Sequence, residues 1–292
     1  MLKRKFVRTS LFANGLVFFI ATVNGTDNKQ AVNTSVTEDV GPIVRQLQAF
    51  DSSFIDLNEF PDSVLINAPK IHLNASVVKF VKDYNKKNEE CLQKIKERSG
   101  SPFLMMDSIF TKYHLPVELK YLAVVESELT AKARSHAGAT GPWQLMASTA
   151  RDLSLKVRGR YDERTNYYKS TIAAAKYLRD LYNQFGDWLL VIAAYNSGPG
   201  KVLYAIKVTG SHNFWVLQRF LPAETRGHVK RFIATHYYFE GTGGITTLTK
   251  KEALAYKNVV SGYIAKQRIE LEKNKITGAE VTSLGKADAE KK

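Results

Sequence analysis

The chain has 292 residues, 44% of them hydrophobic and 24% charged, with a formal net charge of +14 and a single cysteine. This composition is ordinary for a globular protein and allows one large domain or two small ones with buried cores. The lone Cys91 excludes a disulfide within the chain. The positive charge predicts a polyanionic neighbour, which could be nucleic acid, anionic lipid or an acidic envelope polymer.

Residues 1–25 have the pattern of a secretory signal peptide. Basic residues crowd positions 3–8, an apolar run follows from Leu11 to Val23, and Gly25 stands near a plausible cleavage point. The run is shorter than the roughly 20 residues that a membrane span needs, and an uncleaved anchor is the alternative. Because no cysteine stands at the end of this segment to carry a lipid, we expect a periplasmic or cell-envelope protein without a lipid anchor.

The stretch that follows changes from a linker to helices. Residues 26–70 are polar and lack a sustained hydrophobic period, which indicates an arm or linker. Asn74 is the expected cap of a helical pattern in two pieces over residues 77–95. The Ser-Gly-Ser-Pro sequence at 99–102 breaks that pattern, and another short helix is expected over residues 103–113.

Glu126 is the most informative residue of the next segment. A helix is expected to begin at or beside Pro116, whose missing N–H costs nothing at a helix start. In such a helix Leu119, Leu122 and Glu126 share one apolar face. Burial disfavours the ionised carboxylate and favours the protonated form, which a general acid needs. The alternative is a structural glutamate at a helix end, held by a cap or an ion pair.

Residues 148–186 predict two helices. A short one covers residues 148–153, and a longer one is expected to be capped by Ser170 or Thr171 and ended by Gly186.

A central helix is expected directly afterwards. Asp187 can cap residues 188–194, which are apolar on every side and therefore predict a buried helix. This helix is expected to stop at the polar, glycine-rich sequence 195–200. Such an ending would bring Tyr195 and Asn196 to the floor of a cleft.

The C-terminal third predicts further helices and a charged tail. Helices are expected from Pro199 to Val208 and from Pro222 to Tyr238. Residues 246–292 are rich in lysine and glutamate, with an amphipathic helix expected over 253–271 and disorder from Ala279.

The predicted fold is therefore mainly α, with a catalytic unit and its leading helices over residues 71–245. The histidines are scattered without the spacing of metal ligands, so we expect no metal site and no cofactor.

Several motifs together resemble the lytic transglycosylases that have the soluble, lysozyme-like catalytic domain. The resemblance covers roughly residues 70–245 and is nearest to the branch of membrane-bound lytic murein transglycosylase D. Its motifs are Glu126-Ser127, Ser135, Gly138-Ala139, Gly141, Trp143-Gln144, Met146, the run 193–200 and the run 222–226.

This resemblance implies a reaction and a set of site residues. Members of the family cut the β-1,4 bond between N-acetylmuramic acid and N-acetylglucosamine in peptidoglycan without adding water, which leaves a 1,6-anhydro end. Glu126 would act first as the acid and then as the base. The substrate-binding residues implied are Ser135, Gln144, Met146, Tyr195, Asn196 and Glu224.

Some of these residues have simpler structural explanations. Met146 could be part of the core, Ser135 could cap a turn, and Glu224 could be a first-turn carboxylate favoured by the helix dipole. The partner implied is the peptidoglycan glycan strand rather than nucleic acid, because the basic residues are spread along the chain. Peripheral contact with the envelope or membrane is also expected.

A hydrolytic glycosidase would need a second carboxylate, about 5–5.5 Å from the first for retention or roughly 6.5–9.5 Å for inversion. Glu128 is two residues from Glu126 and points to a different face of the helix. Asp152, Asp162, Asp187 and Glu224 remain as candidates, with Asp187 better explained as a cap and Asp162 as a turn residue. The lack of an obvious second acid favours a transglycosylase over a muramidase. A non-catalytic wall-binding protein is the other alternative, and the intact Glu126 motif argues against it.

The sequence departs from the family in two ways. His228 stands where the family usually has tyrosine, so an imidazole replaces a hydroxyl and the detail of substrate positioning is in doubt. The branch often carries a lipid anchor and C-terminal peptidoglycan-binding repeats, and neither is recognised in the sequence. The lysine-rich tail could attract envelope polyanions instead, with a solvated helix face as the alternative.

Overall fold

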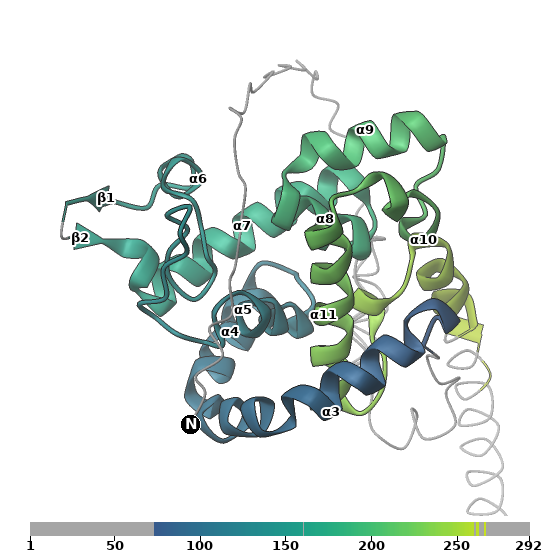
Figure 1. Ribbon diagram of the computed structural model, residues 1–292, viewed down its shortest axis with the longest axis horizontal. Helices are drawn as coiled ribbons and strands as arrows, with labels where there is room; N and C mark the ends of the chain where they lie inside the picture. Colours follow the sequence, from purple (N-terminus) through teal and green to yellow (C-terminus); the bar gives the residue numbers. More distant parts are fainter. Residues whose placement is uncertain (1–72, 160, 260, 263–265, 267–292) are drawn as a thin grey trace, which may run out of the picture.

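The computed structural model describes residues 73–159, 161–259, 261, 262 and 266, and these are mainly helical (Figure 1). The predicted mainly α fold is confirmed. The predicted signal peptide (1–25), the polar arm (26–70) and most of the charged tail lie outside the described residues. Within the described range, no helix is both long enough and apolar enough to cross a bilayer.

Two helices lead into the central motif. The Asn74 side chain accepts a hydrogen bond from the Ser76 N–H, which confirms the predicted cap, and α3 (Ala75–Arg98) follows as one continuous helix instead of two pieces. The break is confined to Ser99. The next helix, α4 (Gly100–Lys112), already includes the Gly-Ser-Pro sequence that was expected to interrupt it, because proline is tolerated in the first turn of a helix.

The helix that carries Glu126 is short and almost wholly buried. Pro116 caps a 3₁₀ turn, η2 (Val117–Leu119), which runs directly into α5 (Lys120–Ser127). Every residue of α5 except Glu126 is buried. Glu128 follows in the left-handed conformation with its side chain exposed, so it ends the helix and points away from the core.

A protruding region follows α5 and lies at the left of Figure 1. It contains the irregular segment 128–146, then α6 (Ala147–Asp152), the two-stranded antiparallel sheet of β1 (Val157–Arg158) and β2 (Tyr161–Asp162), and η3 (Glu163–Thr165). The predicted short helix over 148–153 is confirmed.

The predicted cap of α7 (Tyr167–Phe185) is wrong. The helix begins four residues earlier than expected, because Asn166 accepts a hydrogen bond from the Lys169 N–H and serves as its cap. Ser170 and Thr171 lie inside the first turns, where both hydroxyls donate back to helix carbonyls. The predicted end at Gly186 is confirmed, since this glycine adopts a left-handed conformation with φ of 60°.

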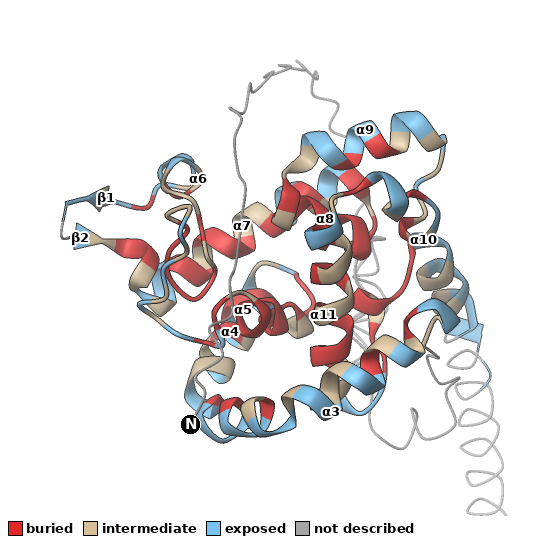
Figure 2. Cartoon of the chain, viewed as in Figure 1, coloured by how far each residue is buried: buried red, intermediate tan, exposed pale blue. Residues whose placement is uncertain are grey.

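The central helix α8 (Trp188–Ser197) is buried as predicted, and Figure 2 shows it in red over most of its length. Asp187 Oδ1 accepts from the Leu190 N–H at 3.1 Å, which confirms the cap. Its Oδ2 accepts from the Lys250 N–H at 2.6 Å, and burial raises the pKa of this carboxyl to about 6. The helix continues through Ser197, two residues beyond the expected stop at Tyr195.

The remaining elements surround this centre. Pro199 begins α9 (Pro199–Thr209) as predicted, and α10 (Phe214–Leu217) and η4 (Gln218–Phe220) lead to α11 (Ala223–Glu240), which Pro222 caps. Helix α11 packs against α3, α8 and α5, so the N-terminal and C-terminal parts of the described chain meet there.

The start of the charged tail is helical, but not where the sequence indicated. After η5 (Ile245–Thr247) a helix begins at Lys250, whereas the expected start was Ala253. Glu252 accepts hydrogen bonds from the N–H and hydroxyl of Thr249, so a capping box sets the earlier start.

Candidate active site

A cleft opens where the end of α5, the segment 128–146, the end of α8 and the beginning of α11 meet. Its described lining residues are Val125, Glu126, Ser135, Ala139, Gln144, Tyr195, Asn196, Glu224, His228 and Arg231. All but one of the site residues expected from the sequence are in this lining. The exception is Met146, which is half-buried and caps α6 instead.

Glu126 projects into the cleft from the last turn of α5. The rest of that helix is fixed in the core, and only 16% of the Glu126 side chain is exposed. Ser127 holds the helix end to the neighbouring segment, because its hydroxyl donates to the Pro142 carbonyl at 2.8 Å. The carboxyl is therefore carried on a buried helix and is itself only slightly exposed.

His228 is the direct partner of this carboxyl. Its Nε2 lies 2.9 Å from Glu126 Oε1, although the two residues are 102 positions apart in sequence. The His228 side chain is 3% exposed, and its Nδ1 has no hydrogen-bond partner among the described residues. Sequence reasoning connected His228 with substrate positioning and did not predict its contact with Glu126. Only a spatial pairing of α5 with α11 could have indicated this contact.

Ser135 and Gln144 bring polar side chains to the opposite wall. Ser135 Oγ accepts from the Ala139 N–H at 3.0 Å, so it closes a turn. Gln144 has a left-handed backbone with φ of 46°, and its amide nitrogen donates to the carbonyls of Gly141 and Ala133. Both side chains thus shape the segment on which they lie as well as lining the cleft.

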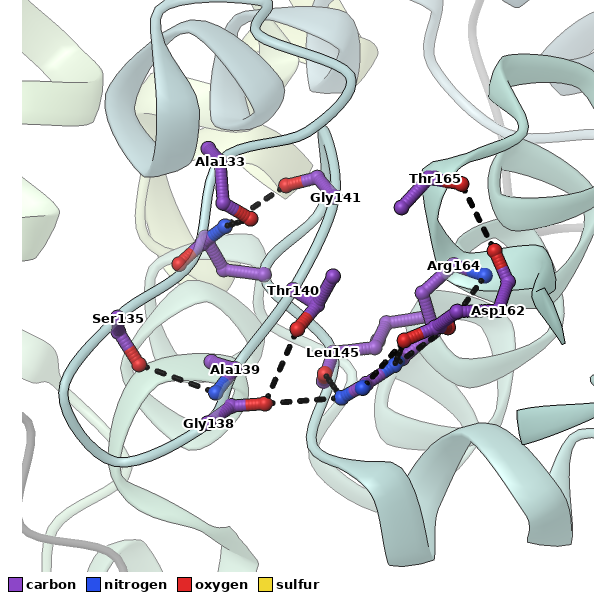
Figure 3. Close-up of polar contacts among 11 residues, drawn as sticks. Ala133, Ser135, Gly138, Ala139, Thr140, Gly141, Leu145, Asp162, Arg164 and Thr165 are labelled. Atoms are coloured by element: carbon purple, nitrogen blue, oxygen red, sulfur yellow. Dashed lines mark hydrogen bonds and ion pairs between the residues drawn. The ribbon is translucent and has the colours of Figure 1, made fainter. Parts of the chain in front are cut away.

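Arg164 holds the segment 128–146 in place, a role that was not predicted from the sequence. Figure 3 shows its guanidinium between the segment and Asp162. Nη1 donates to the carbonyls of Gly138 (2.9 Å) and Leu145 (2.8 Å), while Nε and Nη2 bind the Asp162 carboxylate. The Asp162 pKa is lowered, chiefly by this hydrogen bonding with Arg164.

Gly141 allows the segment 128–146 to approach the backbone of Arg164 closely. Its φ is +85°, and a Cβ at this position would lie 1.8 Å from the Arg164 carbonyl oxygen. A residue without a side chain is therefore required here on both conformational and steric grounds.

Tyr195 and Asn196 form the floor of the cleft at the end of α8, as the sequence predicted from their place after an apolar helix. The Tyr195 hydroxyl donates to the Trp143 carbonyl at 2.7 Å. Burial first, and the Glu126 charge second, raise the pKa of Tyr195, so its hydroxyl stays protonated. Asn196 Oδ1 accepts from the Thr225 hydroxyl at 2.8 Å, which ties α8 to α11.

The first turns of α11 supply the remaining wall. Glu224, His228 and Arg231 follow one another at helical spacing, so they share one face of the helix. Glu224 is exposed and lies near the outer end of this face. Arg231 was not predicted, and the spacing from Glu224 was the signal that could have indicated it. Among the described residues, no cluster of three or more potential metal-ligating side chains occurs.

Comparison with known proteins finds a family match for most of the segments that line this cleft, though not for α11. Residues 108–218 match the family model described as the transglycosylase SLT domain. The resemblance seen in the motifs is confirmed over these residues.

A curated relative and two solved structures extend the comparison. The chain is 43% identical over 128 residues to the membrane-bound lytic murein transglycosylase D of Escherichia coli strain K12, covering 42% of this chain and 28% of that protein. The alignment thus spans less than a third of the relative's length.

The solved structures are both lytic transglycosylases. An inactive mutant of Slt from Pseudomonas aeruginosa is 26% identical, with a TM-score of 0.42 over 47% of this chain and 24% of that one. The 70 kDa soluble lytic transglycosylase of Escherichia coli is 22% identical, with a TM-score of 0.43 over 57% of this chain and 31% of that one.

Proposed function

We propose that the chain is a peptidoglycan lytic transglycosylase in which Glu126 acts first as the acid and then as the base. The observation that carries the proposal is the position of Glu126: a poorly exposed carboxyl at the edge of a cleft, on a helix within the segment that matches the transglycosylase SLT domain. The substrate would be the β-1,4 bond between N-acetylmuramic acid and N-acetylglucosamine.

The proposed reaction needs no water. The Glu126 carboxyl gives its proton to the glycosidic oxygen, the bond from C1 of the muramic acid to this oxygen breaks, and the N-acetylglucosamine part leaves with a hydroxyl. The carboxylate then takes the proton of the muramic acid C6 hydroxyl, and that oxygen bonds to C1. The product is a 1,6-anhydro end, and Glu126 returns to its acid form. Positioning by the cleft supplies much of the rate enhancement.

The surrounding side chains support a mechanism in which Glu126 alone is the acid and the base. Glu128 is exposed and turned away from the cleft, so it is not available as a second acid. Tyr195, which stays neutral, and Asn196 line the cleft with Glu126, which supports our proposal that they hydrogen-bond the sugars. Met146 caps α6, and we propose at most an indirect role for it.

A hydrolytic muramidase is the second candidate, and one observation favours it. Glu224 lines the same cleft as Glu126, one helical turn from His228. A carboxylate there could activate a water molecule. Its exposed place in the first turn of α11 equally fits a sugar-binding residue favoured by the helix dipole.

Product analysis on purified sacculi separates the candidates. The wild-type protein should release muropeptides with 1,6-anhydro ends, Glu126→Gln should release none, and Glu224→Gln should keep the anhydro product at a reduced rate. Ends heavier by one water, lost in Glu224→Gln, would instead establish a muramidase. Equal clearing of peptidoglycan by wild type and Glu126→Gln would contradict catalysis at this cleft.

The setting of the enzyme is also proposed. The basic and apolar pattern of residues 1–25 supports export to the periplasm or cell envelope, where the net charge of +14 would favour contact with acidic polymers. Residues 71–245 would form the catalytic unit, and the tail from residue 246 would be an accessory segment.

A further inference from the structure

We propose that His228 is a positioning residue for Glu126: neutral, with its proton on Nε2, it donates a hydrogen bond to Oε1 and so fixes the orientation of the carboxyl. This inference rests on the proposed function. Its basis is the 2.9 Å contact between the two side chains, together with the buried Nδ1 on the other side of the ring, which has no hydrogen-bond partner in the described part of the chain.

The surroundings of the ring decide its protonation state. An imidazolium would place a charged N–H at Nδ1, where burial removes water and the described residues offer no acceptor. A proton on Nδ1 alone would likewise leave a buried donor unsatisfied, which is rarer in proteins than an unsatisfied acceptor. The neutral form with its proton on Nε2 avoids both penalties.

The charged and titratable groups around the ring are of both signs. Those that line the cleft beside His228 are Glu126 on α5, Tyr195 on α8, and Glu224 and Arg231 on α11. The two carboxylates would favour a positive ring and the Arg231 cation disfavours one, so the lack of a described acceptor at Nδ1 is the observation that selects the neutral form. Tyr195 donates its hydroxyl to Trp143 and stays neutral, so it adds no charge.

This hydrogen bond serves both halves of the reaction. While Glu126 is protonated, its Oε1 accepts from His228, which holds the carboxyl in one orientation. As the proton leaves, negative charge grows on the carboxylate and the hydrogen bond strengthens. His228 therefore stabilises the transition state more than the bound substrate, and its loss should lower kcat rather than raise KM.

Two amide substitutions test which of the two ring nitrogens of His228 is needed for activity. The glutamine amide nitrogen is as many bonds from Cα as Nε2, and the asparagine amide nitrogen is as many as Nδ1. His228→Gln should therefore keep the donor to Glu126 and retain kcat within about threefold. His228→Asn should lower kcat by about tenfold to a hundredfold, with KM changed by less than about threefold.

The kinetics would be measured on soluble peptidoglycan strands over a range of pH, with thermal melting of each variant as the folding control. His228→Gln should keep the wild-type shape of the pH profile, because the amide, like the proposed Nε2–H, supplies an uncharged donor to Glu126. Equal activity of the two variants, a rise in KM instead of a fall in kcat, or a limb of the profile lost in His228→Gln would overturn the proposal.

A measurement on the wild-type protein tests the proposal without any substitution. Nitrogen NMR of histidine-labelled protein should show His228 as the neutral ring with its proton on Nε2 at the pH used for the kinetics. A proton on Nδ1, or an imidazolium, would contradict the inference. A wild-type protein that folds but forms no anhydro product would sink the proposed function instead, so the two failures are distinguishable.

Discussion

The two walls of the cleft satisfy their buried polar groups differently. On the wall formed by residues 128–146, Arg164 donates to the Gly138 and Leu145 carbonyls and to the Asp162 carboxylate. On the wall formed by α11, His228 meets Glu126 through one nitrogen and leaves the other without a described partner. The first wall is built for rigidity. The second wall has a buried nitrogen, Nδ1 of His228, without a described partner. It belongs to the ring that contacts Glu126, the carboxyl that we expect to donate and accept protons.

The first wall should be broken most completely at Gly141. Gly141→Ala brings a Cβ to 1.8 Å from a backbone carbonyl oxygen, which no side-chain movement can relieve, so we expect a loss of more than about 4 kcal/mol in the free energy of unfolding.

Gly138→Ala is the matched control for this substitution. Gly138 has nearly the same φ of +86° but no heavy atom within 4 Å of the added Cβ, so the cost should be only about 1–2 kcal/mol. Urea unfolding measures both. Similar losses in the two variants would show that the close approach at Arg164 does not matter.

Removing the Arg164 guanidinium should have the next largest effect on stability. Arg164→Met removes the guanidinium that donates to two carbonyls and to the Asp162 carboxylate, and we expect it to lower the free energy of unfolding by about 3–5 kcal/mol. Arg164→Lys is the control that keeps the charge but not the forked geometry, and it should recover only part of the loss. Full recovery in urea unfolding would mean that charge alone holds the segment.

His236 is another buried histidine, and unlike His228 it does not line the cleft. Burial first, and the Lys120 cation second, lower the pKa of His236 to about 3. Because the unfolded chain takes up this proton near pH 6.5, the stability from His236 is complete above that pH and is lost as the pH falls toward 3. We expect a loss of about 2 kcal/mol between pH 7.5 and 5.

Urea unfolding at the two pH values tests this expectation. His236→Gln should remove that part of the pH dependence, whereas His212→Gln, at an exposed site, should leave it unchanged. An identical pH dependence in wild type and His236→Gln would exclude His236 as its source.

The features that the sequence predicted correctly are local ones. Asn74, Asp187 and Pro199 act within a turn of their own helix, and the apolar run 188–194 has no polar face to expose. The same local signals also failed where two candidates competed. Asn166 caps α7 in preference to Ser170, because the serine hydroxyl is occupied by a helix carbonyl.

The missed features join distant parts of the chain. Arg164 acts on carbonyls of residues 138 and 145, and backbone carbonyls leave no trace in the amino-acid sequence. The Glu126–His228 contact depends on how α11 packs against α5, which the helical period does not specify. Most of the motif residues therefore line the cleft, with Met146 as the exception, while the partner of each side chain required the structure.

The central claim is that Glu126 cleaves the glycosidic bond without water, and digestion of sacculi in ¹⁸O-labelled water tests it directly. A transglycosylase forms the new bond to C1 from the substrate's own C6 oxygen, so the account predicts anhydro-ended products without the label. Products that carry one ¹⁸O at C1 from the start of the reaction would contradict it and show that water is the attacking group.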